Sequence, residues 1–149
     1  MISIVDTYRA LGDEKSLSLF NTVVSSQYDS YELQSKIKLT RKQFYSRISN
    51  LMKAGLIRRK NTVYSATTYG KLIYNCQTTV EKAIESYPKL KAIDSLEMSN
   101  ELSKEEFTGI VDILIDNHEI KDRILKDRNI LKAKENNLAT NKIPIPKNF

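Results

Sequence analysis

The strongest constraint on the fold lies between residues 40 and 57, where the sequence is TRKQFYSRISNLMKAGLI. One apolar stripe recurs there at helical spacing, and its members are Phe44, Ile48, Leu51 and Met52. Thr40 suits the N-cap, because its hydroxyl can accept a hydrogen bond from a backbone N–H that lacks a helical partner. Gly55 suits the left-handed position after the last turn. The stretch therefore predicts a helix that ends near Gly55 and a strand that begins at Leu56.

The polar face of this predicted helix carries cations and neutral hydrogen-bonding groups but no carboxylate. Its members are Arg41, Lys42, Gln43, Tyr45, Ser46, Arg47, Ser49, Asn50 and Lys53. Cations suit the phosphates of a nucleic acid, and Arg, Gln, Asn and Ser side chains can hydrogen-bond base edges. A solvated amphipathic helix would have the same apolar stripe, so the helix alone leaves both interpretations open.

The distribution of charge favours the nucleic-acid interpretation. No Asp or Glu occurs between Leu33 and Val80, although the chain of 149 residues contains 18 of them. Ten of the 24 cations lie in this window: Lys36, Lys38, Arg41, Lys42, Arg47, Lys53, Arg58, Arg59, Lys60 and Lys71. The window therefore carries +10 and the rest of the chain −4. Because solvated helix faces normally mix both signs, we expect one part of the chain to meet a polyanion.

Composition limits the fold class and the compartment. Four Gly and three Pro argue against a β-sandwich or barrel, which needs many turns. The single cysteine, Cys76, excludes an internal disulfide and fits a reducing cytoplasm. No apolar run approaches the roughly 20 residues of a membrane span, and the first residues lack the basic region of a signal peptide. We therefore expect a soluble, cytoplasmic protein with no membrane contact.

Patterns before residue 40 predict two further helices and a tight turn. After a lead-in helix over residues 2–11, Asp13 can cap a helix that continues to about Ser25. Ser30 is the cap expected for a short helix over Tyr31–Ile37. Only Lys38 and Leu39 separate that helix from Thr40, which is the spacing of a helix-turn-helix.

Two extended runs follow Gly55 and flank a turn at Lys60–Asn61, so they predict a β-hairpin. Three consecutive cations, Arg58, Arg59 and Lys60, occupy its first strand and tip. Such a hairpin beside a helix in the major groove is well placed to contact the DNA backbone or minor groove. The predicted fold class is mainly α, an α+β winged helix with a three-helix core and a short hairpin wing.

Residues 8–74 resemble the winged helix-turn-helix transcription regulators of archaea and bacteria, particularly the archaeal type. The matching segments are Ala10–Asp13, Ser46–Leu51, Ala54–Ile57 and Ala66–Gly70. The resemblance implies that residues 40–54 form a recognition helix and that a helix after the wing pairs with its two-fold mate. The wing of this chain is short for the family, which limits its contacts to phosphates.

A long helix is predicted from residue 68 to 87, with Thr67 as its cap and Pro88 after its end. Its apolar stripe continues beyond the length that a winged helix needs for its own core. Either this stripe pairs with a second copy or it packs against the chain's own C-terminal helices. We favour dimerisation, because two-fold symmetry suits a palindromic operator, through Leu72, Ile73, Cys76, Val80 and Ile84.

The remaining sequence is helical and mixed in charge. A short amphipathic segment at Leu90–Leu96 precedes a capping box at Ser103–Glu106, and a further helix is expected from His118 to about Leu131. The predicted domains are residues 1–67, a DNA-binding winged helix; residues 68–131, a dimerisation or regulatory helical region; and residues 132–149, a flexible tail.

Groups that carry catalysis or hold a cofactor are scarce. The one histidine, His118, lies in a charged segment with no serine–acid partner, and Cys76 is expected to be a buried structural thiol. One Cys and one His cannot form a Cys/His zinc site, and no glycine-rich phosphate loop is present. We expect no enzyme, no metal and no cofactor.

Six of the eight tyrosines fall near the winged helix, namely Tyr28, Tyr31, Tyr45, Tyr64, Tyr69 and Tyr74. They could stack on the bases of single strands, although at helical spacing we expect most of them in the core or at its rim.

These patterns together predict a dimeric transcription regulator that binds double-stranded DNA. We expect Lys42, Gln43, Ser46 and Asn50 to face bases or phosphates, with Tyr45 beside them. Arg41 and Arg47 would hold the backbone at the groove edge, and Arg58, Arg59 and Lys60 the neighbouring phosphates. The alternatives are a protein-interaction adaptor of the transcription machinery and an RNA-binding winged helix.

Overall fold

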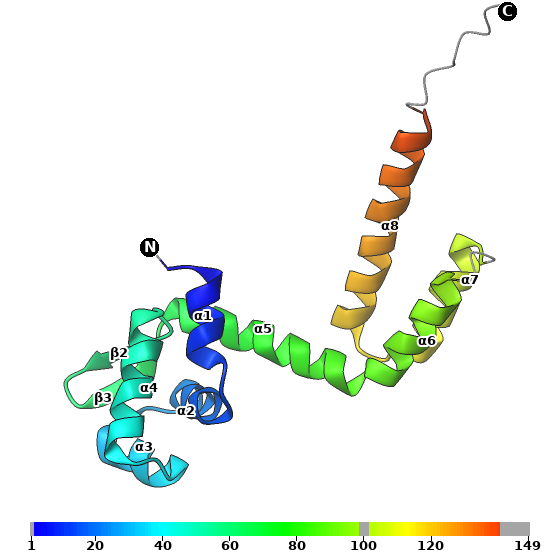
Figure 1. Cartoon of the computed structure of the whole chain (residues 1–149). Coiled ribbons are helices and arrows are strands. Elements are labelled where there is room, and N and C mark those ends of the chain that lie inside the picture. Colours follow the sequence, from blue (N-terminus) through cyan, green and yellow to red (C-terminus); the bar gives the residue numbers. More distant parts are fainter. Residues whose placement is uncertain (1, 99–101, 141–149) are drawn as a thin grey trace, which may run out of the picture. The chain divides into compact units, whose positions relative to one another are not determined.

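The computed structural model describes residues 2–98 and 102–140 (Figure 1). By contacts the chain divides into two compact units, residues 1–78 and residues 79–149. The elements in chain order are α1 (Ile4–Leu11), α2 (Glu14–Ser25), β1 (Tyr28–Asp29), α3 (Ser30–Ile37), α4 (Arg41–Lys53), β2 (Ile57–Lys60), β3 (Val63–Ala66), α5 (Thr68–Glu85), α6 (Tyr87–Met98), α7 (Lys104–Leu114) and α8 (His118–Thr140).

Side-chain caps define the starts of the helices in the first unit. Thr40 caps α4 as predicted, and Gln43 completes a capping box with it. The cap of α3 is Asp29 and not the predicted Ser30, because the Asp29 carboxylate accepts hydrogen bonds from two backbone N–H groups, each at 2.8 Å. Between these helices Lys38 adopts the left-handed conformation, with φ of 53°, which closes the tight turn of the helix-turn-helix.

A small antiparallel sheet follows α4. Gly55 is left-handed as predicted, with φ of 73°, and it turns the chain from α4 into β2. In the hairpin, Ile57 lies opposite Ala66, and Asn61 has φ of 57° at the predicted turn. The sequence did not predict β1, which pairs with the other side of β3 in the order β1-β3-β2. A strand of two residues carries too little pattern to be recognised alone.

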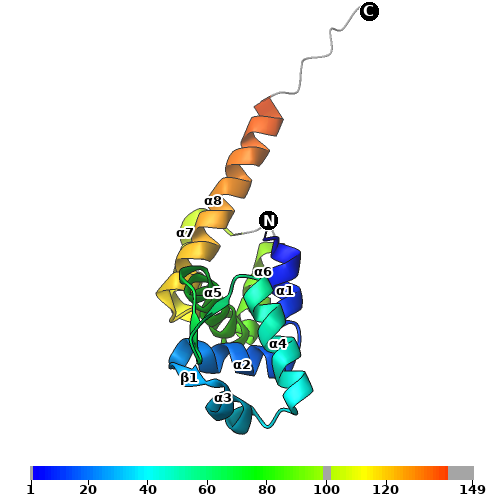
Figure 2. The same cartoon turned by 90° about the vertical axis from the view of Figure 1, so that its left-hand side faces the viewer.

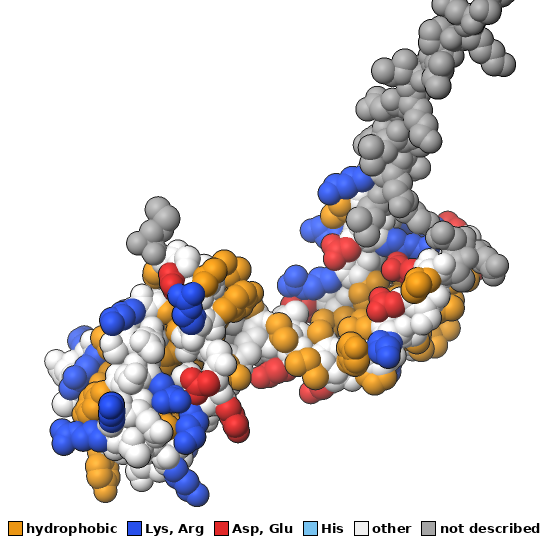
Figure 3. Space-filling view, in the orientation of Figure 1, with side chains coloured by type: hydrophobic (Ala, Val, Ile, Leu, Met, Phe, Trp, Pro, Cys, Tyr) orange, Lys and Arg blue, Asp and Glu red, His pale blue; other side chains and the backbone are white. Residues whose placement is uncertain are grey.

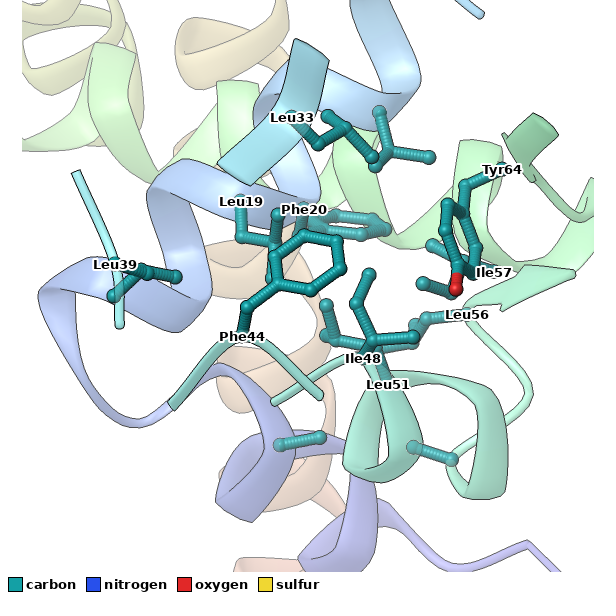
Figure 4. Packing of buried hydrophobic residues seen from close by; sticks show 13 residues of the cluster. Leu19, Phe20, Leu33, Leu39, Phe44, Ile48, Leu51, Leu56, Ile57 and Tyr64 are labelled. Atoms are coloured by element: carbon teal, nitrogen blue, oxygen red, sulfur yellow. The ribbon is translucent and has the colours of Figure 1, made fainter. Parts of the chain in front are cut away.

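The core of the first unit forms where α2, α3, α4 and the sheet meet (Figure 4). Three of the four predicted stripe residues of α4 are buried: Phe44, Ile48 and Leu51. Phe44 lies edge to face with Tyr64 of β3, with ring centroids 6.2 Å apart, so the wing is packed onto α4. Each such buried side chain contributes about 1.5–3 kcal/mol of transfer free energy.

Helices α1 and α5 complete the first unit. α1 lies beside α4 (Figures 1 and 2), and its buried Thr7 hydroxyl lies 2.8 Å from the hydroxyl of Tyr69 in α5. Thr67 caps α5, because its hydroxyl accepts a hydrogen bond from the Gly70 N–H at 2.9 Å. The elements of this unit form a winged helix, so the predicted fold class is confirmed.

The second unit has a core of its own, formed by Ile93, Phe107, Val111, Ile115 and Ile120. Ser103 and Glu106 form the predicted capping box of α7. The long helix α5 ends at Glu85 and not at residue 87 as predicted. Pro88 therefore lies in the first turn of the next helix, α6. A proline is tolerated there because the first backbone N–H groups of a helix have no helical partner.

The division between the two units lies further along the chain than residue 67, at which the predicted winged-helix domain ends. The first unit extends to Thr78, because Tyr69, Ile73 and Tyr74 of α5 pack on its core. α8 continues to Thr140, so helical backbone occupies the first part of the predicted tail, and residues 141–149 lie outside the described residues. Among the described helices, none has both the length and the apolarity needed to cross a bilayer.

Candidate nucleic-acid interface

The structure places the predicted DNA-binding residues on α4 and the adjoining hairpin of the first unit. Nine of the ten are exposed: Arg41, Lys42, Gln43, Tyr45, Ser46, Asn50, Arg58, Arg59 and Lys60. In Figure 3, Lys and Arg side chains (blue) are spread over this part of the first unit. The fold thus brings together cations that are separated by up to about twenty positions in the chain.

One line of side chains on α4 points away from the core. Lys42, Ser46 and Asn50 are spaced four residues apart, so they stack along one side of the helix. All three are exposed, whereas Phe44 and Ile48 are buried. This side therefore presents one ammonium, one hydroxyl and one amide to a neighbouring surface.

Arg47 is the exception among the predicted contacts. Its guanidinium hydrogen-bonds Asp13, with Nε 3.3 Å and Nη2 3.2 Å from the carboxylate oxygen, and its side chain is only 23% exposed. Hydrogen bonds from Ser16 and from Arg47 hold the pKa of Asp13 below its ordinary value. Arg47 therefore links α4 to the N-terminus of α2, and its charge is already partly compensated. No local pattern could have predicted this pair, since 34 positions separate its members.

Gln43 is also engaged within the protein. Its side-chain oxygen accepts a hydrogen bond from the Thr40 N–H at 3.2 Å. In this geometry the amide NH₂ group is left to donate outward, so Gln43 could address only acceptor atoms of a ligand, such as purine N7 and guanine O6.

The wing holds its arginines in place before any ligand binds. Arg59 Nε donates to the carbonyl of Asn61 at 2.8 Å, and its guanidinium lies over the Tyr64 ring, 5.5 Å from the centroid. Arg58 Nε lies 3.5 Å from the Ser65 hydroxyl. These contacts lower the side-chain entropy that Arg58 and Arg59 would lose on binding a phosphate.

Four exposed cations of the acid-free window were not among the predicted contacts: Lys36, Lys38, Lys53 and Lys71. Lys36 donates to the Tyr28 hydroxyl at 2.8 Å, and this hydrogen bond holds the pKa of Tyr28 below its ordinary value. Lys53 lies at the end of α4. These cations lie in the acid-free window, and this position in the sequence could have marked them as candidate contacts.

The predicted dimerisation residues of α5 divide into two groups. Leu72, Val80 and Ile84 are exposed, Leu72 by 59%, whereas Ile73 packs against the core of the first unit. Cys76 is exposed, so the expectation of a buried thiol was wrong. The reason is that the opposite face of α5 covers the core, which leaves Cys76 on the outer side.

An apolar face on α1 was missed as a candidate interaction surface. Ile4, Val5 and Tyr8 are all exposed, although their spacing resembles that of a core-facing stripe. In the part of the chain that the structure describes, no three His, Cys, Asp or Glu side chains gather into a set that could hold a metal ion.

No protein-family model and no curated protein sequence matches the chain. Among solved structures, similar chains include HlyU from Vibrio cholerae, with 18% identity and a TM-score of 0.44 over 51% of this chain and 88% of that one. The transcriptional repressor BigR from Xylella fastidiosa has 20% identity and a TM-score of 0.44 over 52% and 84%. An ArsR-like transcriptional regulator from Rhodococcus has 18% identity and a TM-score of 0.42 over 64% and 91%.

Proposed function

We propose that this protein is a dimeric winged-helix transcription regulator, of the archaeal type that its sequence resembles, and that it binds double-stranded DNA. The observation that carries the proposal is the exposed surface of α4 and the wing, which combines cations with neutral hydrogen-bonding groups and no carboxylate. α4 would enter the major groove, and the wing would contact the phosphate backbone beside it.

The side chains divide between two roles. Lys42, Ser46 and Asn50 lie along the outer side of α4 and would address base edges, where an asparagine amide can pair with adenine N6 and N7. Four exposed cations would contact phosphates: Arg41, Arg58, Arg59 and Lys60. Phosphate contacts position the protein, and base contacts give it sequence preference.

Dimerisation is supported by apolar side chains that the described chain leaves exposed. Leu72 of α5 and Ile4, Val5 and Tyr8 of α1 are exposed within the first unit. Covering apolar area of this kind is favourable by about 25 cal/mol per Å² before association costs. A second copy of the chain would place two recognition helices on one duplex, and two half-sites would then be read together.

The test compares binding of labelled random-sequence DNA duplexes and RNA duplexes of equal length. We expect DNA to bind more tightly, because the narrow major groove of A-form RNA excludes a helix. The double variant Arg58→Ala/Lys60→Ala should weaken DNA binding. Its matched control is Lys91→Ala/Lys126→Ala, which removes two exposed cations of the second unit. Equal binding of RNA, or capture of an acidic protein without DNA binding, would overturn the proposal.

A further inference from the structure

A groove of about 450 Å³ lies between α4 and the wing. Its floor is apolar, since buried Ile48 and Tyr64 contribute to it. Its sides carry Tyr45, which is 44% exposed, and Met52, which is 40% exposed. Met52 belongs to the predicted core stripe of α4, yet it faces this groove. The two side chains thus place apolar surface on an otherwise polar helix face.

The charge around this groove has one sign. Lys53 and Arg59 line it, and Arg41 lies over the Tyr45 ring, 5.9 Å from the centroid. No carboxylate is among the residues that line the groove. Tyr45 also lies edge to face with buried Phe44, with 5.3 Å between the ring centroids. The groove thus offers the Tyr45 ring, with Arg41 over one of its faces, and an apolar floor between cations.

A ligand that matches this surface has a flat apolar face and a negative charge close to it. A nucleotide has both, because the base stacks on an aromatic ring while its phosphate meets a cation. Bases within a duplex already stack on each other, so their faces cannot enter the groove. Only an unpaired base can enter. The groove also adjoins the surface proposed to contact DNA, so the same strand can reach both.

We propose that the groove between α4 and the wing binds an unpaired nucleobase of single-stranded DNA, stacked on Tyr45, with its phosphates at Arg59 and Lys53. This site deepens the proposed function, because the protein would then hold locally opened DNA as well as a duplex. Stacking of one base on an aromatic side chain corresponds to about a 5- to 150-fold gain in affinity.

The experiment measures fluorescence anisotropy with the full chain and two labelled oligonucleotides. One is an oligothymidylate, and the other has the same length and the same phosphates but abasic sugars. We expect the wild type to bind the oligothymidylate about tenfold more tightly or better. Tyr45→Ala should bind both equally, and Tyr45→Phe, which keeps the ring, should retain the preference. Met52→Ala should reduce the preference without weakening abasic binding.

The matched control is Tyr31→Ala, which removes a tyrosine that is 82% exposed on α3 and outside the groove. It should leave the preference unchanged. Equal wild-type affinity for the two oligonucleotides would overturn the single-strand site. If the wild type nevertheless binds duplex DNA, the proposed regulator function stands, whereas absence of duplex binding as well would contradict both proposals. Circular dichroism of each variant separates loss of folding from loss of stacking.

Discussion

Arg47 of α4 and Asp13 at the start of α2 form a hydrogen-bonded ion pair at 3.2 Å. The same Asp13 carboxylate accepts from the backbone N–H groups of Lys15 and Ser16, at 3.1 and 3.0 Å. One carboxylate therefore caps α2 and holds α4 against it. This arrangement orients α4 against α2, and it predicts that the charge of Asp13 affects stability.

The stability of the first unit should depend on pH through Asp13. Its pKa is lowered in the folded protein, so its contribution is fully present above the unfolded value of about 3.9. The contribution is lost as the pH falls through the folded pKa. Urea unfolding should therefore lose more free energy between about pH 5 and pH 3 in the wild type than in Asp13→Asn. That variant keeps the capping oxygen but not the charge, and parallel pH profiles would exclude the effect.

Two glycines within helices, Gly70 and Gly109, differ in how closely other atoms approach them. A Cβ at Gly70 would lie 2.0 Å from the Leu56 carbonyl oxygen, which is backbone and cannot move away, whereas a Cβ at Gly109 meets nothing within 4 Å. Gly70→Ala should therefore destabilise the protein by several kcal/mol, as overpacking against backbone does. Gly109→Ala should stabilise it by up to about 1 kcal/mol. Thermal unfolding measures both, and equal effects would contradict the close approach of α5 to Leu56.

If the protein dimerises through α5, a charge at the exposed Leu72 should weaken the dimer. Leu72→Glu places a charge on a surface that is 59% exposed in the single chain, so the monomer should stay folded while the dimer dissociates at least tenfold more readily. Lys71→Glu, at the neighbouring exposed position, is the control. Sedimentation equilibrium gives the dissociation constants. An unchanged association of Leu72→Glu would remove α5 from the interface.

Base contacts and phosphate contacts should respond differently to mutation. Asn50→Ala should change the order of preference among duplex sequences by about 1–3 kcal/mol at one position. Arg58→Ala should weaken all sequences to a similar degree, because phosphates carry no sequence information. Selection from a random duplex library, performed with each variant, distinguishes these results. A sequence preference that is unchanged in Asn50→Ala would exclude this residue as a base contact.

Local signals predicted much of the winged helix. The Thr40 cap, the Ser103 capping box, the left-handed Gly55 and the turn at Asn61 each depend on side chains within a few positions. The burial of Phe44, Ile48 and Leu51 followed from helical spacing. Asp29 was missed as a cap because Ser30 beside it is a comparable candidate.

The remaining features depend on contacts between distant segments. Residue spacing could not show that Arg47 meets Asp13 or that β1 pairs with β3. It also could not show which apolar positions the chain covers. Met52 and Cys76 both lie on apolar stripes, yet both are exposed, because each helix turns only part of its stripe toward the core.

The acid-free surface of α4 and the wing is proposed to contact the phosphates of duplex DNA. Four exposed cations on each of two copies would make eight phosphate contacts. Binding of a random-sequence duplex, measured at about 50 mM and about 200 mM salt, should then weaken by about 10³-fold or more. An affinity that does not change between these salt concentrations would contradict phosphate binding by α4 and the wing.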